Sequence, residues 1–385
     1  MTKLKKEPKK MKVVFPIYHD MQFQSRPQEC VAAMKLMGVN EIVMVTIAPW
    51  TLCPDGVRVI LTKHDDALRY MHFYRTAIQT IKAENPDIVM LHDDFTAPIL
   101  RWLIKHHFRG KIIFDESELY IDEKKKIKNI KDIGFSFLPY CEKKYLKKVD
   151  ALIAANKERA EIMMKIYDLP QMPIILENMR RLMIEPDWES CDAKYGSLFR
   201  KNALTVLYGG GVKETRRTLE LAEAVKRLGA DFNLIITGGG DSGEIQKLKT
   251  LIESNPSDNI HYVGLAPRGE WKYLITKSDI CVSIYDQNTY NNKYCASGRF
   301  YEGILEGIPV LATENPPMKN ACNDFGFGVS TENLEAGLRE LKNNYRHYKD
   351  NAKKFAIECK YEERIPRLAQ QIEERLKEGE TCLHG

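Results

Sequence analysis

The feature that most constrains the fold of this chain is an alternation of short apolar runs with amphipathic stretches. Short apolar runs are typical of buried strands, and apolar residues at helical spacing between them are typical of covering helices. In the first half the strand-like runs are 12–17, 41–47, 57–60, 87–92, 111–115, 151–155 and 173–176. In the second half the order restarts with 203–208, 232–237, 261–264, 280–284 and 309–312. The alternation predicts parallel βαβ units in two Rossmann-like, doubly wound α/β sheets.

Residues 185–202 interrupt this pattern, because prolines, acids and a tryptophan spoil both the strand and the helix periods. We therefore expect an N-terminal domain at 1–184, a linker at 185–202 and a C-terminal domain at 203–358. The charged tail is helical in pattern, and its last helix, within 359–385, is expected to return and pack on the first domain. Ligands of such sheets bind at the carboxyl ends of the strands, here in a cleft between two facing domains.

The composition excludes several classes of protein. The chain has 385 residues, 44% hydrophobic and 29% charged. It contains no apolar run of about 18 residues, so a membrane-spanning helix is not expected. No apolar signal core follows its basic N-terminus, so a secretory signal is not expected either. Nine cysteines without C-x-x-C spacing are typical of reduced thiols in the cytoplasm, and no ligand spacing predicts zinc or another metal.

One segment, 121–149, concentrates positive charge, with nine lysines against four acidic residues. Aromatic residues lie between these lysines, in the stretch 133–140. Lysines interleaved with aromatics suit an anionic membrane surface or a phosphate-bearing acceptor. The alternative is a solvated helix face beside a core-packing loop. Nucleic acid is not expected as a partner, because no recognition motif accompanies the basic segment.

The most informative local motif begins at Ser297-Gly298-Arg299 and continues through Glu302 to a strand-like run after Gly307. A helix that starts at a small, flexible turn offers free N–H groups and a positive dipole end, which suit a phosphate. An acid further along the same helix can accept hydrogen bonds from a sugar hydroxyl. The motif predicts a site for a nucleotide sugar.

A second motif, Gly209-Gly210-Gly211, follows a strand and precedes a helix with Lys213 and Arg216 near its start. Glycines allow close approach of the backbone to a ligand, and the cations lie where a diphosphate would bind. The motif differs from the dinucleotide fingerprint, because no small residue occupies the later position. The alternative is a tight strand-to-helix turn with surface cations, and Gly238-Gly239-Gly240 is interpreted as such a loop.

Taken together, the second-half segments resemble the nucleotide-sugar domain of family-4 retaining glycosyltransferases. The resemblance rests on the order and spacing of 208–224, 234–240, 260–264, 278–283 and 300–310. More loosely, 87–92, 113–120, 149–154 and 175–178 resemble the first domain of that family. The resemblance implies the GT-B fold, a nucleoside-diphosphate sugar as donor substrate, retention of anomeric configuration, and no cofactor or obligatory metal.

The resemblance also implies residue roles. Glu302 would bind the donor ribose, and the backbone at Ser297, Gly298 and Arg299 would hold the diphosphate. The expected catalytic residues are His92, Arg216 and Arg299, although His92 is alternatively a satisfied histidine at a strand end. The other donor-binding residues are expected to be Gly210, Gly211, Lys213, Gly264 and Tyr294. Glu118 and Tyr120 are expected on the acceptor side.

Three positions and one loop depart from the family pattern. Tyr294 stands eight positions before Glu302, where family members usually carry another glutamate. Gly211 replaces an arginine, Ser117 replaces a histidine, and 16–22 replaces a glycine-rich loop. These departures leave the identity of the donor sugar open.

The expected function is transfer of a sugar to an acceptor hydroxyl, on a lipid-linked or surface saccharide of polysaccharide biosynthesis. The protein would act in the cytoplasm, peripherally at the inner face of the cell membrane. One alternative is a non-catalytic nucleotide-sugar or glycan-binding subunit of another transferase. A second alternative is a GT-B-fold epimerase or phosphorylase.

Overall fold

The computed structural model describes residues 11–21, 25–50, 53–62, 68–120 and 130–381, with 130–136 and 379–381 described by their backbone only. The chain forms two compact units. Unit 1 is built from Met1–Glu177 and Glu362–Gly385, and unit 2 from Asn178–Tyr361.

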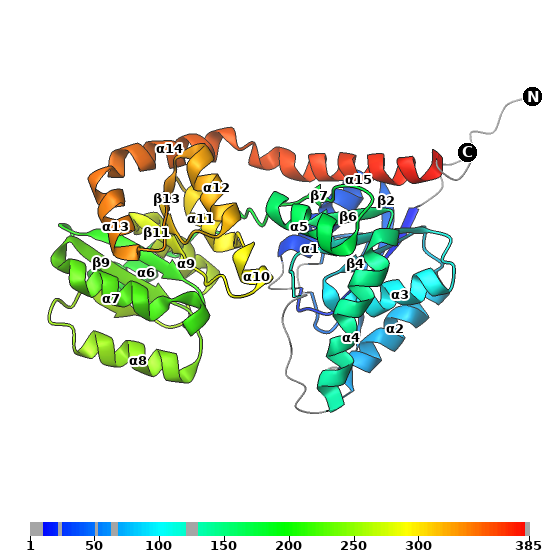
Figure 1. Ribbon diagram of the computed structural model, residues 1–385, viewed down its shortest axis with the longest axis horizontal. Helices are drawn as coiled ribbons and strands as arrows, with labels where there is room; N and C mark the ends of the chain where they lie inside the picture. Colours follow the sequence, from blue (N-terminus) through cyan, green and yellow to red (C-terminus); the bar gives the residue numbers. More distant parts are fainter. Residues whose placement is uncertain (1–10, 22–24, 51–52, 63–67, 121–129, 382–385) are drawn as a thin grey trace, which may run out of the picture. The chain divides into compact units, whose positions relative to one another are not determined.

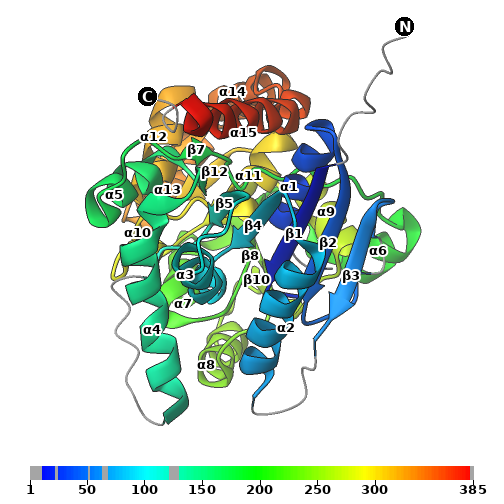
Figure 2. The same cartoon turned by 90° about the vertical axis from the view of Figure 1, so that its right-hand side faces the viewer.

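Unit 1 is built on a seven-stranded sheet with the order β3-β2-β1-β4-β5-β6-β7, in which every pairing is parallel. Figure 2 shows β5, β4, β1, β2 and β3 side by side. The central strands are buried because helices cover both faces of a parallel sheet. The strands are β1 (Met11–Ile17), β2 (Val39–Thr46), β3 (Val57–Leu61), β4 (Ile88–His92), β5 (Lys111–Glu116), β6 (Ala151–Ala154) and β7 (Ile174–Ile175).

Helices connect most of these strands, as is usual between parallel strands. The connecting helices are α1 (Ser25–Leu36), α2 (Arg69–Glu84), η1 (Asp94–Thr96), α3 (Ala97–Lys105), α4 (Ile130–Tyr145), η2 (Leu146–Lys148) and α5 (Lys157–Tyr167). Among the described residues, no helix is long and apolar enough to cross a membrane.

The last helix, α15 (Arg364–Thr381), belongs to unit 1 although it ends the chain. Leu368, Ala369 and Ile372 are buried in the same core as β1 and α1. Arg364 donates hydrogen bonds to Glu29 on α1 and to the Glu177 carbonyl. Figure 1 shows α15 in red beside β6 and β7. The predicted return of the last helix to the first unit is confirmed.

Unit 2 is built on a six-stranded parallel sheet with the order β10-β9-β8-β11-β12-β13. Its strands are β8 (Leu204–Gly209), β9 (Phe232–Thr237), β10 (Ile260–Tyr262), β11 (Ile280–Ser283), β12 (Val310–Ala312) and β13 (Gly328–Ser330). Its helices are α6 (Trp188–Tyr195), η3 (Gly196–Leu198), η4 (Glu214–Arg216), α7 (Thr218–Leu228), η5 (Gly229–Asp231), α8 (Ser242–Glu253), α9 (Arg268–Lys277), α10 (Tyr290–Lys293), α11 (Gly298–Leu305), α12 (Pro316–Phe325), α13 (Leu334–Asn343) and α14 (Tyr345–Glu358), with η6 (Tyr361–Glu363) at the passage to unit 1.

The structure differs from the sequence prediction in two places. β13 is a sixth strand, where we expected five in the second half, and it is stabilised by pairing with β12. The stretch 185–202, expected as a linker, contains α6 and η3, and Cys191 and Tyr195 of α6 are buried against α9 of unit 2. The chain passes between the units at Glu177/Asn178 and Tyr361/Glu362 instead. The predicted fold class, two Rossmann-like α/β sheets, is confirmed.

Candidate functional site

In unit 2 the strand order reverses between β8 and β11, which lie side by side although they are distant in sequence. The loops that leave their carboxyl ends run in opposite directions and open a crevice, the usual ligand site of such sheets. Gly209-Gly210-Gly211 leaves β8 here, and Tyr285 follows β11. The start of α11 also reaches this edge, because Ser297 Oγ lies 3.4 Å from Ser283 Oγ at the end of β11.

The glycines at the carboxyl ends of β8 and β9 have different roles. A Cβ on Gly209 would lie 2.3 Å from the Trp271 ring, and a Cβ on Gly238, whose φ is +140°, would lie 1.8 Å from the Gly210 carbonyl oxygen. Gly209 and Gly238 therefore allow two chain segments to pack closely. A Cβ on Gly211 would meet only the Lys213 side chain, at 3.5 Å. Gly211 thus leaves room beside the turn.

Two of the predicted donor-binding glycines are engaged within the protein. The Gly210 N–H is donated to the Thr237 carbonyl, at 3.0 Å. Gly264, with φ +72°, accepts hydrogen bonds at its carbonyl from the Gly238 N–H and the Thr237 hydroxyl. Both residues therefore shape the loops at this edge, and neither contact presents an N–H to a ligand.

Arg216, at this edge, has an incompletely bonded guanidinium. Its guanidinium carbon lies 3.8 Å from the centroid of the Tyr285 ring. Its Nη1 is buried and has no hydrogen-bond partner among the described residues. A buried guanidinium N–H without a partner is costly, and an anion would satisfy both its hydrogen bond and its charge.

Tyr285 links Arg216 to the start of α11. Its ring is buried under the guanidinium. Burial raises the pKa of the Tyr285 phenol, while a hydrogen bond with Ser297 acts against this rise. The Arg216 guanidinium and the Ser297 hydroxyl therefore both contact the neutral side chain of Tyr285.

The start of α11 has the features of an anion site. Ser297 is the N-cap residue, yet its side chain caps no backbone N–H. The N–H groups of the first turn are the positive end of the helix dipole. Arg180 lies beside them, since a Cβ on Gly298 would be 3.0 Å from Arg180 Nε. The sequence analysis did not identify Arg180, because its segment is distant in sequence from α11.

Glu302 is 5% exposed on α11 and is held by two donors. Trp271 donates its indole N–H to Oε2 at 2.8 Å, and Arg299 donates Nη1–H to the same oxygen at 2.9 Å. Among the described residues, no group binds the second oxygen, Oε1. That oxygen can accept a hydrogen bond from a sugar hydroxyl.

Arg299, one of the expected catalytic residues, is engaged within the protein. Its guanidinium lies over the Trp271 ring, 4.0 Å from the centroid, and forms an ion pair with Glu302. Its charge is therefore shared with a carboxylate. Lys213 is exposed beside Gly211. Tyr294 ends α10 and stacks on Tyr290, with ring centroids 6.0 Å apart.

The sheet of unit 1 has its own reversal point, between β1 and β4. His92 ends β4 and is 2% exposed, with its Nδ1 hydrogen-bonded to Asp115 at 2.9 Å and its Nε2 3.1 Å from Asp93 Oδ2. Burial lowers the pKa of His92, but the negative charges of Asp93 and Asp115 outweigh it and raise the pKa above its usual value. Both ring nitrogens are engaged. This geometry matches the alternative interpretation, a satisfied histidine at a strand end.

Asp93 adopts an unusual backbone conformation, with φ 56° and ψ 174°. This region is essentially limited to glycine, and residues forced into it are concentrated at functional sites. The carboxylate accepts hydrogen bonds from the Ser117 N–H at 2.9 Å and the Ser117 hydroxyl at 2.7 Å. His19, in the loop after β1, lies 3.5 Å from Asp93 Oδ2. The sequence analysis did not connect His19 with Asp93, because their proximity depends on the strand order.

The expected acceptor-side residues follow β5. Glu118 pairs with the buried Arg159 of α5, at 3.6 Å. Arg159 also donates a hydrogen bond to the Ser117 carbonyl. Tyr120 is half-buried at the last position before 121–129, which lie outside the described residues. Glu118 is thus paired with Arg159, a residue that the sequence analysis did not identify.

Part of the basic segment 121–149 lies outside the described residues, but the second half of α4 is described. Phe137 and Tyr140 are 38% and 49% exposed and stack with ring centroids 5.7 Å apart. Arg101 lies over the Phe137 ring, and Lys144 donates a hydrogen bond to the Tyr140 hydroxyl at 3.0 Å. Leu138 and Cys141, on the other face of α4, are buried. We call Phe137, Tyr140, Lys144 and Arg101 the α4 patch.

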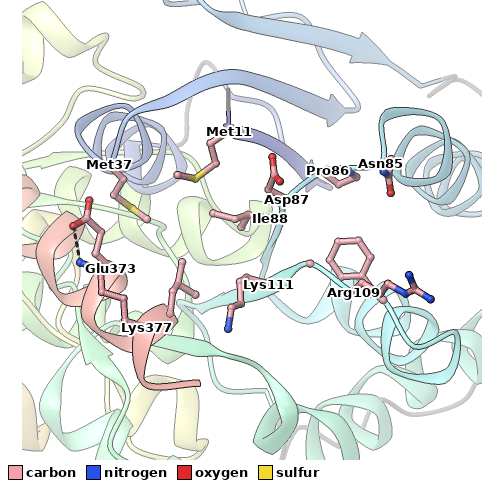
Figure 3. Close-up of a pocket in the computed structure, with 13 residues that line it drawn as sticks. Met11, Met37, Asn85, Pro86, Asp87, Ile88, Arg109, Lys111, Glu373 and Lys377 are labelled. Carbon is pink, nitrogen blue, oxygen red and sulfur yellow. Dashed lines mark ion pairs between the residues drawn. The ribbon is translucent and has the colours of Figure 1, made fainter. Parts of the chain in front are cut away.

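A cavity of about 920 Å³ lies elsewhere in unit 1, at the amino ends of β1, β4 and β5. Figure 3 shows Met11, Ile88 and Lys111 from these strands, facing the Glu373–Lys377 ion pair of α15. Ligands of open α/β sheets bind at the opposite, carboxyl edge. We therefore place the candidate site at the β8–β11 edge of unit 2.

Comparisons with known proteins support the fold assignment. Neither a protein-family model nor a curated protein matches the sequence. The structure is similar to WaaG, a glycosyltransferase involved in lipopolysaccharide biosynthesis, with a TM-score of 0.68 and 17% identity, over 94% of this chain and 99% of that one. It is similar to Anabaena HepE in complex with UDP-glucose, with a TM-score of 0.67 and 13% identity, over 96% of this chain and 100% of that one.

A third similar structure is sucrose-phosphate synthase from Thermosynechococcus elongatus, with a TM-score of 0.65 and 14% identity, over 97% of this chain and 99% of that one. Sequence identities this low show a shared fold. The fold is GT-B, as the sequence predicted.

Proposed function

We propose that this protein is a glycosyltransferase that moves a sugar from a nucleoside-diphosphate sugar to an acceptor hydroxyl, with retention of anomeric configuration. The observation that carries this proposal is Arg216, whose buried Nη1 has no hydrogen-bond partner in the described part of the chain and lies at the reversal point of the second sheet. The GT-B fold, shared with a structure that contains UDP-glucose, is further support.

The donor diphosphate is proposed to bind between Arg216, Lys213 and the first N–H groups of α11. The helix start offers N–H donors and dipole charge, and Arg216 can bind two phosphate oxygens at once. The free oxygen of Glu302 would accept a hydrogen bond from a ribose hydroxyl. Gly211, in the position where the family usually has an arginine, leaves space beside the turn.

The proposed reaction takes place on one face of the donor sugar. The bond between the anomeric carbon and the phosphate oxygen breaks, and a bond from that carbon to the acceptor oxygen forms on the same face. The acceptor proton passes to the leaving phosphate oxygen. Stabilising the charge on the leaving diphosphate is then the main task, and Arg216 and the α11 start perform it without a metal.

The acceptor is proposed to be a lipid-linked or surface saccharide, reached at the cytoplasmic face of the cell membrane. The α4 patch supports this part of the proposal, because exposed aromatics beside cations suit an anionic membrane surface. Glu118 and Tyr120, in unit 1, are the proposed acceptor-side residues.

The test is a thermal-unfolding screen of the full chain against a panel of nucleoside-diphosphate sugars. A ligand at 100 times its Kd stabilises the folded state by about 2.7 kcal/mol. We expect one donor to raise the Tm, and Arg216→Met to abolish that rise and to lower turnover by about two to three orders of magnitude. Arg339→Met, on the exposed face of α13, is the matched control. A normal Tm rise and turnover in Arg216→Met would refute the assignment.

Incubation of the protein with the donor that the screen identifies, followed by product analysis, separates the alternatives. A non-catalytic subunit, which the departures at Tyr294 and Gly211 favour, would bind a nucleotide sugar without transfer or hydrolysis over long incubation. An epimerase would convert the sugar without any acceptor, and a phosphorylase would depend on inorganic phosphate.

A further inference from the structure

The reversal point of the first sheet carries a cluster of side chains that the proposed transfer does not use. It lies where the loop after β1 meets the end of β4, and its members are His19, His92 and Asp93. These residues belong to unit 1, whereas the proposed donor ligands belong to unit 2.

The three side chains bring their ligating atoms together. His92 Nε2 lies 3.1 Å and His19 Nε2 lies 3.5 Å from the same oxygen, Asp93 Oδ2. All three ligating atoms lie within 4.8 Å of one another. A tetrahedral ion with bonds of about 2.0–2.2 Å to nitrogen and oxygen separates neighbouring ligands by roughly 3.4 Å. The two measured contacts are close to that separation.

A hydrogen bond at Nδ1 fixes the orientation of the His92 ring. Its Nδ1 faces Asp115 at 2.9 Å, and Asp115 is itself bound by Arg26, at 2.6 Å. A carboxylate held by arginine accepts hydrogen bonds, so Nδ1 donates to Asp115 and Nε2 faces Asp93 Oδ2. A carboxylate behind a ligating histidine is the usual outer-shell arrangement at metal sites.

Asp93 is also held in place. Ser117 binds the other oxygen, Oδ1, through its backbone N–H and its hydroxyl, which leaves Oδ2 for the two histidines. The backbone of Asp93 holds this carboxylate from a glycine-like conformation, with φ 56° and ψ 174°.

His19 is the most exposed of the three side chains. Its side chain is 29% exposed, whereas those of His92 and Asp93 are 2% and 7% exposed. Its loop is anchored by the Thr46 hydroxyl, which donates to the His19 carbonyl at 2.7 Å. An ion can therefore enter from the His19 side and keep at least one coordination position for water.

We propose that His19, His92 and Asp93 form a binding site for one divalent transition-metal ion. Two imidazoles and one carboxylate favour Zn²⁺ or Co²⁺ over Mg²⁺ or Ca²⁺, which prefer oxygen ligands.

The test uses the full chain, freed of metal by dialysis against a chelator and titrated with Co²⁺ near neutral pH. We expect one Co²⁺ per chain, with the visible d–d absorption of a four- or five-coordinate ion, displaced by Zn²⁺. His19→Ala should weaken binding by about 100-fold or more, and Ser117→Ala, which removes only a hydrogen bond to Asp93, by about tenfold. Because His19 is partly exposed, His19→Ala should fold normally.

The double variant His106→Ala/His107→Ala is the control for adventitious surface binding, because both histidines are exposed in unit 1. It should bind Co²⁺ as the natural chain does. The proposal is overturned if the natural chain binds no stoichiometric Co²⁺, or if His19→Ala binds it unchanged. The nucleotide-sugar Tm screen uses a different ligand, whose proposed binding residues lie in unit 2, so failure of either proposal is distinguishable from failure of the other.

Discussion

Trp271 donates its indole N–H to Glu302 Oε2 at 2.8 Å, and the Trp271 ring also supports the guanidinium of Arg299. One side chain of α9 thereby orients two residues of α11. Trp271 is itself buried against Gly209 at the end of β8. The position of the Glu302 carboxylate thus depends on a residue that contributes no charge.

We predict that Trp271→Phe raises the donor KM by about tenfold or more and changes kcat less. Loss of a hydrogen bond to a buried charged group costs about 1–3 kcal/mol, and 1.4 kcal/mol is a factor of ten. Steady-state kinetics with varied donor concentration measure the effect. Trp188→Phe, at an exposed position of α6, is the control. An unchanged KM in Trp271→Phe would show that Glu302 needs no orientation by the indole.

A second prediction compares two glycines of the neighbouring loops. Gly238→Ala should destabilise the protein by about 3 kcal/mol or more, because its Cβ would lie 1.8 Å from the Gly210 carbonyl oxygen and its φ is +140°. Gly211→Ala should change the free energy of unfolding by less than about 1 kcal/mol, because its Cβ meets only a flexible lysine.

Denaturant unfolding of both variants measures this difference. If the space beside Gly211 receives the donor, Gly211→Ala should reduce the donor-induced rise in Tm while the ligand-free Tm stays unchanged. Equal destabilisation by the two substitutions would contradict the distinction between a packing glycine and a ligand-facing one.

The strands of both sheets were predictable to within one or two residues in most cases, because buried parallel strands are continuous apolar runs. Strand β13 was not predictable, because Gly328–Ser330 has a single large apolar residue and is defined by its pairing with β12. Helix α6 was missed although Asp187 caps it by accepting from the Ser190 N–H. The mixed composition around that cap obscured the helical period.

The candidate site was predictable where its residues are close in sequence. Arg216 was identified from the glycine turn, and Ser297 and Glu302 from the helix start. Trp271 and Tyr285 were not, because they reach the site from other strands and helices through tertiary packing. The link between His19 and Asp93 was not predictable either, since it requires that β1 and β4 be neighbours.

A third prediction concerns pH. Glu142 of α4 is buried beside Glu116, whose Oε2 has no hydrogen-bond partner among the described residues. Burial raises the pKa of Glu142 to about 8, and the negative charge of Asp94 acts in the same direction. The folded state therefore holds this proton more tightly than the unfolded state, whose glutamates titrate at about 4.3.

The free energy of unfolding should then fall as the pH rises from about 4.3 to about 8, by up to about 1.4 kcal/mol per pH unit from this group. Above the folded-state pKa the contribution is lost and the curve should flatten. Glu142→Gln should reduce the slope, and Glu358→Gln, at an exposed position of α14, should not. Urea unfolding across this pH range measures the slopes, and identical slopes in all three proteins would contradict the prediction.

The last prediction concerns the α4 patch. Phe137 and Tyr140 project from α4 while Leu138 and Cys141 of the same helix are buried, so the helix presents its aromatics without exposing its core face. We expect the full chain to co-float with vesicles that contain anionic lipid at low salt, and to be released as salt rises, because Lys144 and Arg101 supply a screened attraction. Phe137→Ser/Tyr140→Ser should lower the bound fraction several-fold without changing the Tm. Ile357→Ser removes a more exposed apolar residue, one that belongs to unit 2, and should leave flotation unchanged. Flotation on neutral vesicles alone, or equal loss in both variants, would mean that exposed apolar surface in general drives the association. Membrane binding would then give no reason to place the acceptor at an anionic surface.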